Sequence, residues 1–217
     1  MKPLAIFGAG GFGREVYAYA VDAGLPVAGF VDDTADPLAG YDLPTTVLGG
    51  LASIEDVAGY DWVIALGDAG NRELIHRRLS GRGATFVSVV HPTAYVARSA
   101  EVADGCVVAP FAMVGAHAKV GANVALNTYA SIGHDAVIGD HCVFSPYSAV
   151  NGNVIVGAGV FLGSAAIVSP GRRVGRASKI SVGAAVTRDV EAGSLVAGNP
   201  AKGRVMFPVD FPVDEEI

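Results

Sequence analysis

The sequence lacks the features that mark several large classes of protein. Its 217 residues contain no apolar run near the roughly 18 residues that span a bilayer, so we expect no membrane insertion. Lysine and arginine form no cluster and the formal net charge is −6, which argues against nucleic-acid binding. The two cysteines, Cys106 and Cys142, cannot build a disulfide framework and match no zinc spacing. We therefore expect a reducing, cytoplasmic setting and no bound metal.

Glycine is abundant in this chain, whereas bulky residues are scarce. The chain has 29 glycines, nearly twice the usual ~7%, and a single tryptophan. Apolar residues still make up 51% of the sequence, which excludes intrinsic disorder. This combination favours a tightly repeated backbone over a conventional core of large side chains.

Residues 1–88 show an alternation of strands and helices that is typical of a small parallel α/β sheet. Apolar runs predict the strands, and periodic or capped segments predict the helices. The expected strands are 3–7, 26–31 and 62–66, and the expected helices are 14–23 and 71–79, the second one capped by Asn71. Because about 88 residues make half of a full dinucleotide-binding fold, we expect a small Rossmann-like domain.

From Val96 onward the sequence repeats with a strict period of six. Every sixth position from Val96 to Val186 is aliphatic or aromatic, for sixteen consecutive hexads without an insertion. The next position is always small or polar, and the position two residues earlier is mostly small. Helical and simple strand periods do not explain this pattern, whereas a parallel β-helix of hexapeptide repeats does. We expect this β-helix over residues 89–204 and a loosely held tail over 205–217.

A glycine-rich segment, Gly8–Gly13, follows the first expected strand and precedes the first expected helix. With Asp32 and Asp33 about 20 residues later, its spacing fits a fingerprint in which glycines let a phosphate approach a helix N-terminus. By spacing alone, a nicotinamide cofactor, another nucleotide and a plain structural turn all remain possible.

His134 and Asp135 are the candidate catalytic pair of the repeat region. His134 follows the inward-facing Ile132 by two residues, so it should lie near a corner of the β-helix and face outward. A histidine suits the removal of a proton from an acceptor, and the aspartate would orient the imidazole and stabilise its charged form. Residues 18 apart should stack, which places the small residues Ala116 and Gly152 beside His134. The alternative is an ordinary solvated surface histidine.

Several segments together resemble one known family, the bacterial hexapeptide-repeat sugar O- and N-acyltransferases, which include sialic-acid O-acetyltransferases and bacillosamine N-acetyltransferases. The segments that carry the resemblance are 8–16, 30–33, 65–68, the N-T-x-x-x-I-x-H-D segment at 127–135 and the ending A-G-N-P-A-K at 197–202. The resemblance covers about residues 3–203. It implies that the β-helix is left-handed, with three hexads per coil, and that the protein is a homotrimer.

The resemblance also implies roles for particular residues. The histidine of the family motif is the catalytic base, which is His134 here, beside Asp135. Acetyl-coenzyme A lies between neighbouring β-helices in the family, and the matching positions are Val143, Gly152, Ser164 and Val182. The N-terminal domain holds the nucleotide part of a nucleotide-linked sugar, and the matching positions are Gly10, Gly11, Phe12, Asp32, Asp33, Gly67 and Asp68. Phe12 departs from the family, because several members carry a histidine there.

The implied function is acetyl transfer from acetyl-coenzyme A to the amino group of a nucleotide-linked amino sugar, in bacterial surface glycan biosynthesis. Two alternatives remain, namely O-acetylation of a sugar of the sialic-acid type and a non-catalytic nucleotide-binding trimer. Association is also expected from composition, since residues 94–171 carry only six charged side chains and would expose apolar surface. His141 is expected to be a surface or trimer-contact residue.

Overall fold

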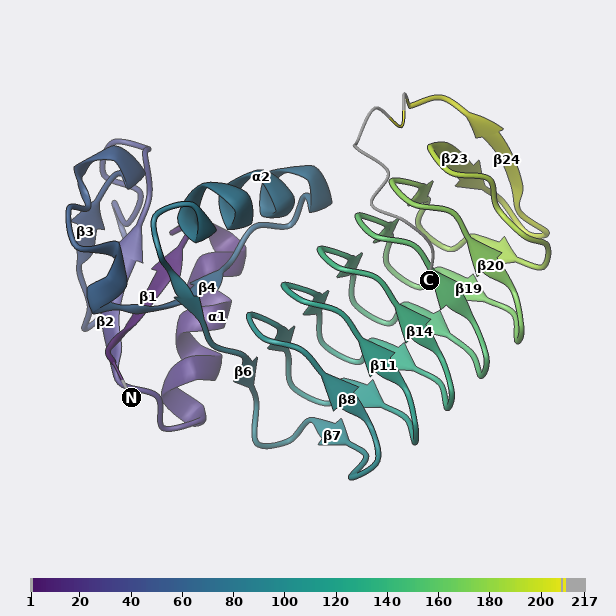
Figure 1. Ribbon diagram of the computed structural model, residues 1–217, viewed down its shortest axis with the longest axis horizontal. Helices are drawn as coiled ribbons and strands as arrows, with labels where there is room; N and C mark the ends of the chain where they lie inside the picture. Colours follow the sequence, from purple (N-terminus) through teal and green to yellow (C-terminus); the bar gives the residue numbers. More distant parts are fainter. Residues whose placement is uncertain (1, 208, 210–217) are drawn as a thin grey trace.

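The computed structural model describes residues 2–207 and residue 209, and it shows two unlike regions (Figure 1). An α/β domain occupies the N-terminal part of the chain, and a parallel β-helix extends away from it towards the C-terminus. Most of the expected tail, 205–217, lies outside the described residues. Within the part of the chain that the structure describes, every helix is too short or too polar to cross a membrane.

The N-terminal domain contains a five-stranded parallel sheet with the strand order β3-β2-β1-β4-β5. Its elements are β1 (Leu4–Phe7), α1 (Gly11–Asp22), β2 (Val27–Val31), β3 (Val47–Gly49), β4 (Asp61–Ile64), α2 (Ala69–Ser80), β5 (Thr85–Phe86) and the short 3-10 helices Leu51–Ser53 and Val57–Gly59. Side chains alternate along β1, because Leu4 and Ile6 pack with α1 whereas Ala5 and Phe7 pack with α2. The expected parallel α/β domain is confirmed.

Both helices begin earlier than the sequence pattern predicts. α1 begins at Gly11, and α2 begins at Ala69. The side chain of Asp68 caps α2 by accepting a hydrogen bond from the backbone N–H of Asn71 at 2.9 Å. The prediction of Asn71 as the cap is therefore wrong, because the preceding aspartate already satisfies its N–H.

The rest of the chain winds into a left-handed parallel β-helix with three flat faces. The docked face, named for its contact with the N-terminal domain, holds β6 (Val89–Val90), β9 (Val107–Val108), β12 (Ala125–Leu126), β15 (Val143–Phe144), β18 (Phe161–Leu162), β21 (Lys179–Ile180), β23 (Ser194–Ala197) and β24 (Lys202–Val205). The second face holds β7 (Tyr95–Val96), β10 (Met113–Val114), β13 (Ser131–Ile132), β16 (Ala149–Val150), β19 (Ile167–Val168) and β22 (Ala185–Val186). The third face holds β8 (Glu101–Val102), β11 (Lys119–Val120), β14 (Val137–Ile138), β17 (Ile155–Val156) and β20 (Arg173–Val174).

Coils stack with the spacing that the sequence predicts. Met113 pairs with Ser131 and Val114 with Ile132, so equivalent residues of adjacent coils are eighteen apart. The sixth-position aliphatics point to the axis and form one continuous buried cluster, in which Cys106 and Cys142 fill small inward positions. Burial raises the pKa of the Cys142 thiol to about 12, so this cysteine is an inert core residue.

Three corners join the faces, and each corner is a short turn repeated in every coil. The first corner joins the docked and second faces, the second corner joins the second and third faces, and the third corner leads back to the docked face. The second residue of many of these turns has a left-handed backbone conformation, such as Asp135 at φ 57° and His141 at φ 62°. Asp, Asn and His tolerate this conformation better than most residues do.

Among the described residues, the N-terminal domain packs against the docked face and not against the other two faces. Val89, Val107 and Ala109 belong to the same buried cluster as α1 and the sheet. At the start of α2, Ala69 contacts Ala125 and Val143, and these two outward-facing residues are buried as a result. The docking therefore covers a face of the β-helix that would otherwise be apolar and exposed.

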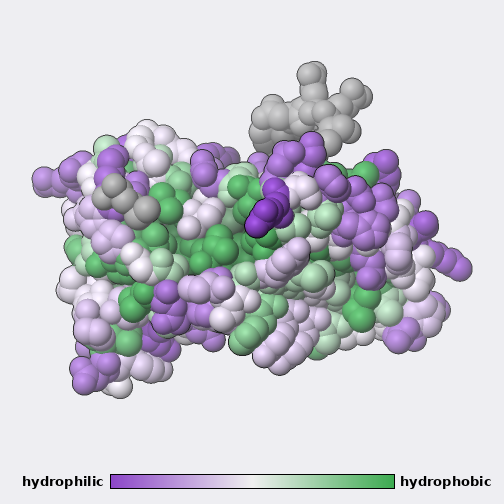
Figure 2. Space-filling model, turned by 90° about the horizontal axis from the view of Figure 1, so that it is seen from below, coloured by the Kyte–Doolittle hydropathy of each residue, from purple (hydrophilic) through white to green (hydrophobic). Residues whose placement is uncertain are grey.

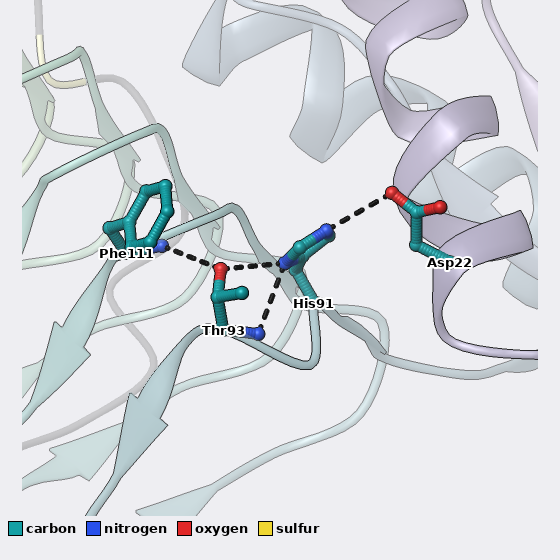
Figure 3. Close-up of polar contacts among 4 residues, drawn as sticks. All are labelled: Asp22, His91, Thr93 and Phe111. Carbon is teal, nitrogen blue, oxygen red and sulfur yellow. Dashed lines mark hydrogen bonds and ion pairs between the residues drawn. The ribbon is translucent and has the colours of Figure 1, made fainter.

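The first corner is tied to the N-terminal domain through His91 (Figure 3). Its Nε2 lies 3.2 Å from a carboxylate oxygen of Asp22 at the end of α1, and its Nδ1 lies 2.8 Å from the hydroxyl of Thr93. The same hydroxyl accepts a hydrogen bond from the backbone N–H of Phe111, one coil further on. His91 thus connects the last turn of a helix in one domain to the first coils of the other.

Candidate functional site

His134 and Asp135 lie side by side on the second corner, as the sequence predicts. Nδ1 of His134 is 2.7 Å from Oδ2 of Asp135, and both side chains are largely exposed. The backbone of this turn is held in the coil ladder, because Asp135 N–H donates to the carbonyl of Ala116 and Asn153 N–H donates to that of His134. A fixed turn therefore presents an imidazole to solvent with a carboxylate at one of its nitrogens.

Gly152 supports the imidazole from the next coil. A side chain at this position would clash with Nε2 and Cε1 of His134, so the ring lies directly over the glycine. Gly152 is buried although it sits at an otherwise exposed corner. The predicted stacking of Gly152 beside His134 thus has a specific consequence: the absence of a side chain at 152 sets where Nε2 lies.

The seven candidate nucleotide-sugar residues come from three loops that meet at one edge of the N-terminal sheet. These loops follow β1, β2 and β4, which are neighbours in the sheet and parallel. Because the carboxyl ends of parallel strands share an edge, the structure gathers Gly10, Gly11, Phe12, Asp32, Asp33, Gly67 and Asp68 into one region. The N-termini of α1 and α2 point to the same edge, where backbone N–H groups favour an anion.

The carboxylates in these loops already accept hydrogen bonds from backbone N–H groups. Asp32 accepts hydrogen bonds from the N–H groups of Ala9 at 2.7 Å and Thr34 at 2.8 Å, and Asp33 accepts one from Leu51 at 2.8 Å. Burial by itself would raise the pKa of Asp32, but the bonds from Ala9 and Thr34 outweigh it and hold this pKa below the usual value. Asp32 is thus an ionised clamp on the glycine-rich turn, with lone pairs left over for a ligand.

The other two loops are open to the docked face. An added Cβ at Gly10 or Gly67 would meet nothing within 4 Å, so both positions border free space. Asp68 lies 3.7 Å from Nζ of Lys179 on β21, and Phe12 packs at the edge of the cluster that contains Val143. The edge with the three loops therefore faces the later coils of the β-helix.

The four candidate cofactor positions do not all lie together. Gly152 is on the second corner, whereas Ser164 and Val182 are stacked on the first corner, so these three border the second face. Val143 is elsewhere: it points out from the docked face and is only 2% exposed because Ala69 covers it. The side chain of Val143 therefore offers almost no exposed surface in a single copy of the chain.

His134 and the loop-bearing edge lie on opposite sides of the β-helix. The second corner, which carries His134, is the only one of the three corners that does not border the docked face in the described chain. Sequence reasoning brings these two sets of residues into one site, but a single copy of the chain does not bring them together.

Two residues that sequence reasoning missed join the domains at the third corner. Arg72 of α2 is fully buried and bonds to Asn123, and Asn123 bonds to His141 one coil above. His141, expected to be a surface or trimer-contact residue, is half-buried, because α2 of its own chain packs over it. An arginine on an amphipathic helix gives no sequence signal of burial, since arginine is rarely buried without partners.

The fold is that of a hexapeptide-repeat acyltransferase. The family model described as PglD N-terminal domain matches residues 3–79, and the model described as bacterial transferase hexapeptide (six repeats) matches residues 117–152. The two regions of the chain are therefore similar to the two parts of the hexapeptide-repeat sugar acyltransferases that carry a PglD-type N-terminal domain. In the described residues, no group of three or more His, Cys, Asp and Glu side chains could hold a metal.

Solved structures resemble this chain over most of its length. A single-histidine variant of perosamine N-acetyltransferase from Caulobacter crescentus, in complex with CoA and GDP-perosamine, is 29% identical with a TM-score of 0.86. That match covers 94% of this chain and 97% of the other. The acetyltransferase domain of PglB from Neisseria gonorrhoeae, in complex with acetyl coenzyme A, is 29% identical with a TM-score of 0.83 over 93% of this chain and 98% of that one. WeeI from Acinetobacter baumannii is 26% identical with a TM-score of 0.81, over 94% of this chain and all of the other.

Proposed function

We propose that the protein is an acetyl-coenzyme A-dependent N-acetyltransferase that acts on the amino group of a nucleotide-linked amino sugar. The observation that carries this proposal is the exposed His134–Asp135 pair, with the imidazole seated over Gly152. The relatives with the same two-domain architecture include perosamine N-acetyltransferase bound to CoA and GDP-perosamine. The gathered loops of the N-terminal domain supply a place for the nucleotide part of the acceptor.

The hydrogen bond to Asp135 fixes which nitrogen of His134 acts as the base. A carboxylate can only accept, so Nδ1 of the neutral imidazole carries the hydrogen and donates a hydrogen bond to Oδ2 of Asp135. Nε2 then holds the free lone pair, and this is the atom that lies over Gly152. Asp135 also stabilises the imidazolium that forms when Nε2 takes up a proton.

Acetyl transfer requires a neutral amine, because an ammonium ion has no lone pair to attack a thioester. As the new C–N bond forms, the amine proton passes to Nε2 of His134, and the C–S bond then breaks. The proton returns from His134 to the departing sulfur, which balances the reaction and restores the base. Backbone N–H groups would stabilise the oxyanion of the tetrahedral intermediate.

A second copy of the chain completes the site in this proposal. His134 lies on the corner opposite the docked face, whereas Gly10, Asp33 and Gly67 lie on the docked side. An acceptor held by the loops of one copy would therefore meet His134 of a neighbouring copy. A closed ring of three copies, the homotrimer expected from the family, repeats this contact without leaving an end.

The β-helix offers an apolar surface for that association. Most of the large apolar side chains that it exposes lie on the first corner and the second face, namely Tyr95, Phe111, Met113, Tyr129, Tyr147, Ile167 and Val182. Three of them, Phe111, Tyr129 and Tyr147, stack one above another at about 5 Å between ring centroids. Figure 2 shows apolar residues gathered in the middle of one face of the molecule, between more hydrophilic ends. Apolar surface of this extent is typical of an interface.

Gly152, Ser164 and Val182 border the second face, so the same association would place them in a groove between copies. We assign acetyl-coenzyme A to this groove and leave Val143 out, because its side chain is covered. A cytoplasmic location belongs to the same proposal, in keeping with two free, buried thiols.

Release of free thiol from acetyl-coenzyme A, measured against a panel of acceptors, tests the reaction. The panel pairs amino sugars with the corresponding hydroxy sugars, each with and without a nucleotide. We expect turnover with a nucleotide-linked amino sugar. Turnover with hydroxy sugars instead would support the O-acetyltransferase alternative, and no turnover with any acceptor would support the non-catalytic one.

Mixed oligomers test the shared site. His134→Ala removes the base, and Gly10→Trp places a bulky side chain at the acceptor loops, at a position where an added Cβ meets nothing within 4 Å. Each variant alone should be inactive, and co-expression of the two should restore part of the activity, because some sites combine an intact loop with an intact His134. If the mixed oligomers stay inactive, the site lies within one chain.

A further inference from the structure

A fully buried arginine connects the two domains at the third corner. Nε and Nη2 of Arg72 donate to the main-chain carbonyl and the side-chain oxygen of Asn123, at 3.0 and 2.7 Å. Its Nη1 donates to the carbonyls of Ile64 and Leu66, at the end of β4. Arg72 thus ties the loop that leads to Asp68 to the second coil of the β-helix. Burial lowers the pKa of Arg72 to about 10, which leaves the guanidinium charged at neutral pH.

The charge on Arg72 fixes the orientation of the Asn123 amide. A guanidinium only donates, so the atom that faces it must be the amide oxygen. The amide nitrogen then points the other way, towards the carbonyl of Arg72 at 3.1 Å and Nδ1 of His141 at 3.0 Å. Because an amide nitrogen only donates, Nδ1 of His141 must accept. An imidazolium has no nitrogen that can accept, so this network requires a neutral His141.

Most of the charged groups around His141 also favour its neutral form. From α2, His76 lies over the imidazole at 5.0 Å between ring centroids, and Arg72 and Arg77 add positive charge. Asp140, on the same turn, is the one nearby group that favours the charged form, and its Oδ1 already accepts from the N–H of Ala122. Burial and then His76 are the main causes that lower the pKa of His141 to about 4.

We propose that Arg72, Asn123 and His141 form a proton-sensitive lock that holds the N-terminal domain on the β-helix and opens when His141 takes up a proton. A proton on Nδ1 would face the amide hydrogens of Asn123, whose orientation Arg72 does not allow to reverse. Release of the lock would free the loop after β4, so that acceptor binding would weaken in acid. Only this last consequence depends on the proposed function.

The direction of the pH dependence follows from linkage. A histidine with a lowered pKa in the folded state has no effect on stability above about pH 6.5, where both states are neutral. As the pH falls from about 6.5 to about 4, the unfolded chain takes up a proton that the folded chain does not, and stability is lost. Below about 4 the loss is complete and constant.

His141→Asn tests the lock, because the amide oxygen of Asn occupies the place of Nδ1, can accept from Asn123 and cannot be protonated. Asn also tolerates the left-handed backbone conformation at this position. Calorimetry of the full chain without ligands should show that the Tm of the wild type falls by on the order of 5 °C more than that of His141→Asn between pH 7.5 and 4.5. The matched control is His117→Asn, an exposed histidine at φ 58° in the equivalent turn position, which should follow the wild type.

Asn123→Asp provides an independent test should His141→Asn fold poorly. A carboxylate at 123 still pairs with Arg72 and can accept a hydrogen bond from the protonated Nδ1 of His141, so the acid-induced loss of Tm should shrink or reverse. The proposal is overturned if His141→Asn loses as much Tm in acid as the wild type, or if Asn123→Asp loses more. Neither readout involves catalysis, so the outcome is separate from that of the acetyl-transfer assay.

Discussion

Two successive corners of one coil carry the same two residue types in opposite order. The second corner has His134 followed by Asp135, and the third corner has Asp140 followed by His141. At the second corner the imidazole faces a carboxylate at 2.7 Å and is exposed. At the third corner it faces an amide whose orientation a buried guanidinium sets.

The difference shows that the hexapeptide repeat positions a side chain but does not determine its chemistry. Both turns are built by the same ladder of backbone hydrogen bonds. What differs lies outside the repeat, since solvent surrounds one histidine and α2 covers the other. One imidazole is therefore open to solvent beside a carboxylate, and the other is held neutral.

Replacing each histidine by alanine should give the largest difference in kcat and Tm between the two corners. His134→Ala removes the base and should lower kcat at least ~100-fold, which corresponds to about 3 kcal/mol of barrier. His141→Ala should leave kcat within a few fold of the wild type and lower the Tm instead. Steady-state kinetics and calorimetry on both variants measure the contrast. If His141→Ala loses the rate and His134→Ala does not, the base has been assigned to the wrong corner.

Gly152→Ala should damage the second corner without removing any functional group. The backbone of Gly152 lies outside the left-handed region, so alanine is tolerated there, but its Cβ would clash with the His134 ring. We expect kcat to fall on the order of tenfold while the oligomer stays intact, because the imidazole must rotate away from its position. Kinetics and light scattering together test this. An unchanged kcat would mean that the position of Nε2 over residue 152 is not the reactive one.

The two aspartates should give the smallest and most direct contrast. Asp135→Asn leaves the turn intact but removes the carboxylate that orients His134, and should lower kcat several-fold or more. Asp140→Asn keeps an oxygen that accepts from Ala122 N–H and removes only a charge beside His141. It should leave kcat unchanged and lower the Tm slightly more in acid than at neutral pH. Equal kinetic effects of the two substitutions would contradict the different roles of the corners.

Much of this structure could be predicted from the spacing of residues. The period of six determined the β-helix and its eighteen-residue stacking, because each hexad folds with its own neighbours and leaves a local pattern. The same pattern placed His134, Asp135 and Gly152 together on a corner. The glycine-rich turn and the aspartates after β2 came together because parallel strands end at one edge.

Only the tertiary structure decided which face of the β-helix the N-terminal domain covers. That choice depends on outward side chains of the repeat, such as Ala125 and Val143, which are small or apolar whether they face solvent or a partner. Docking of the N-terminal domain on this face buries Val143 and makes His141 a domain contact. It also leaves His134 on the opposite side from the acceptor loops of its own chain. It also enclosed Arg72, whose burial is stable only because the end of β4 and Asn123 supply its hydrogen-bond partners together. Those partners are distant in sequence, so no local pattern could have indicated them.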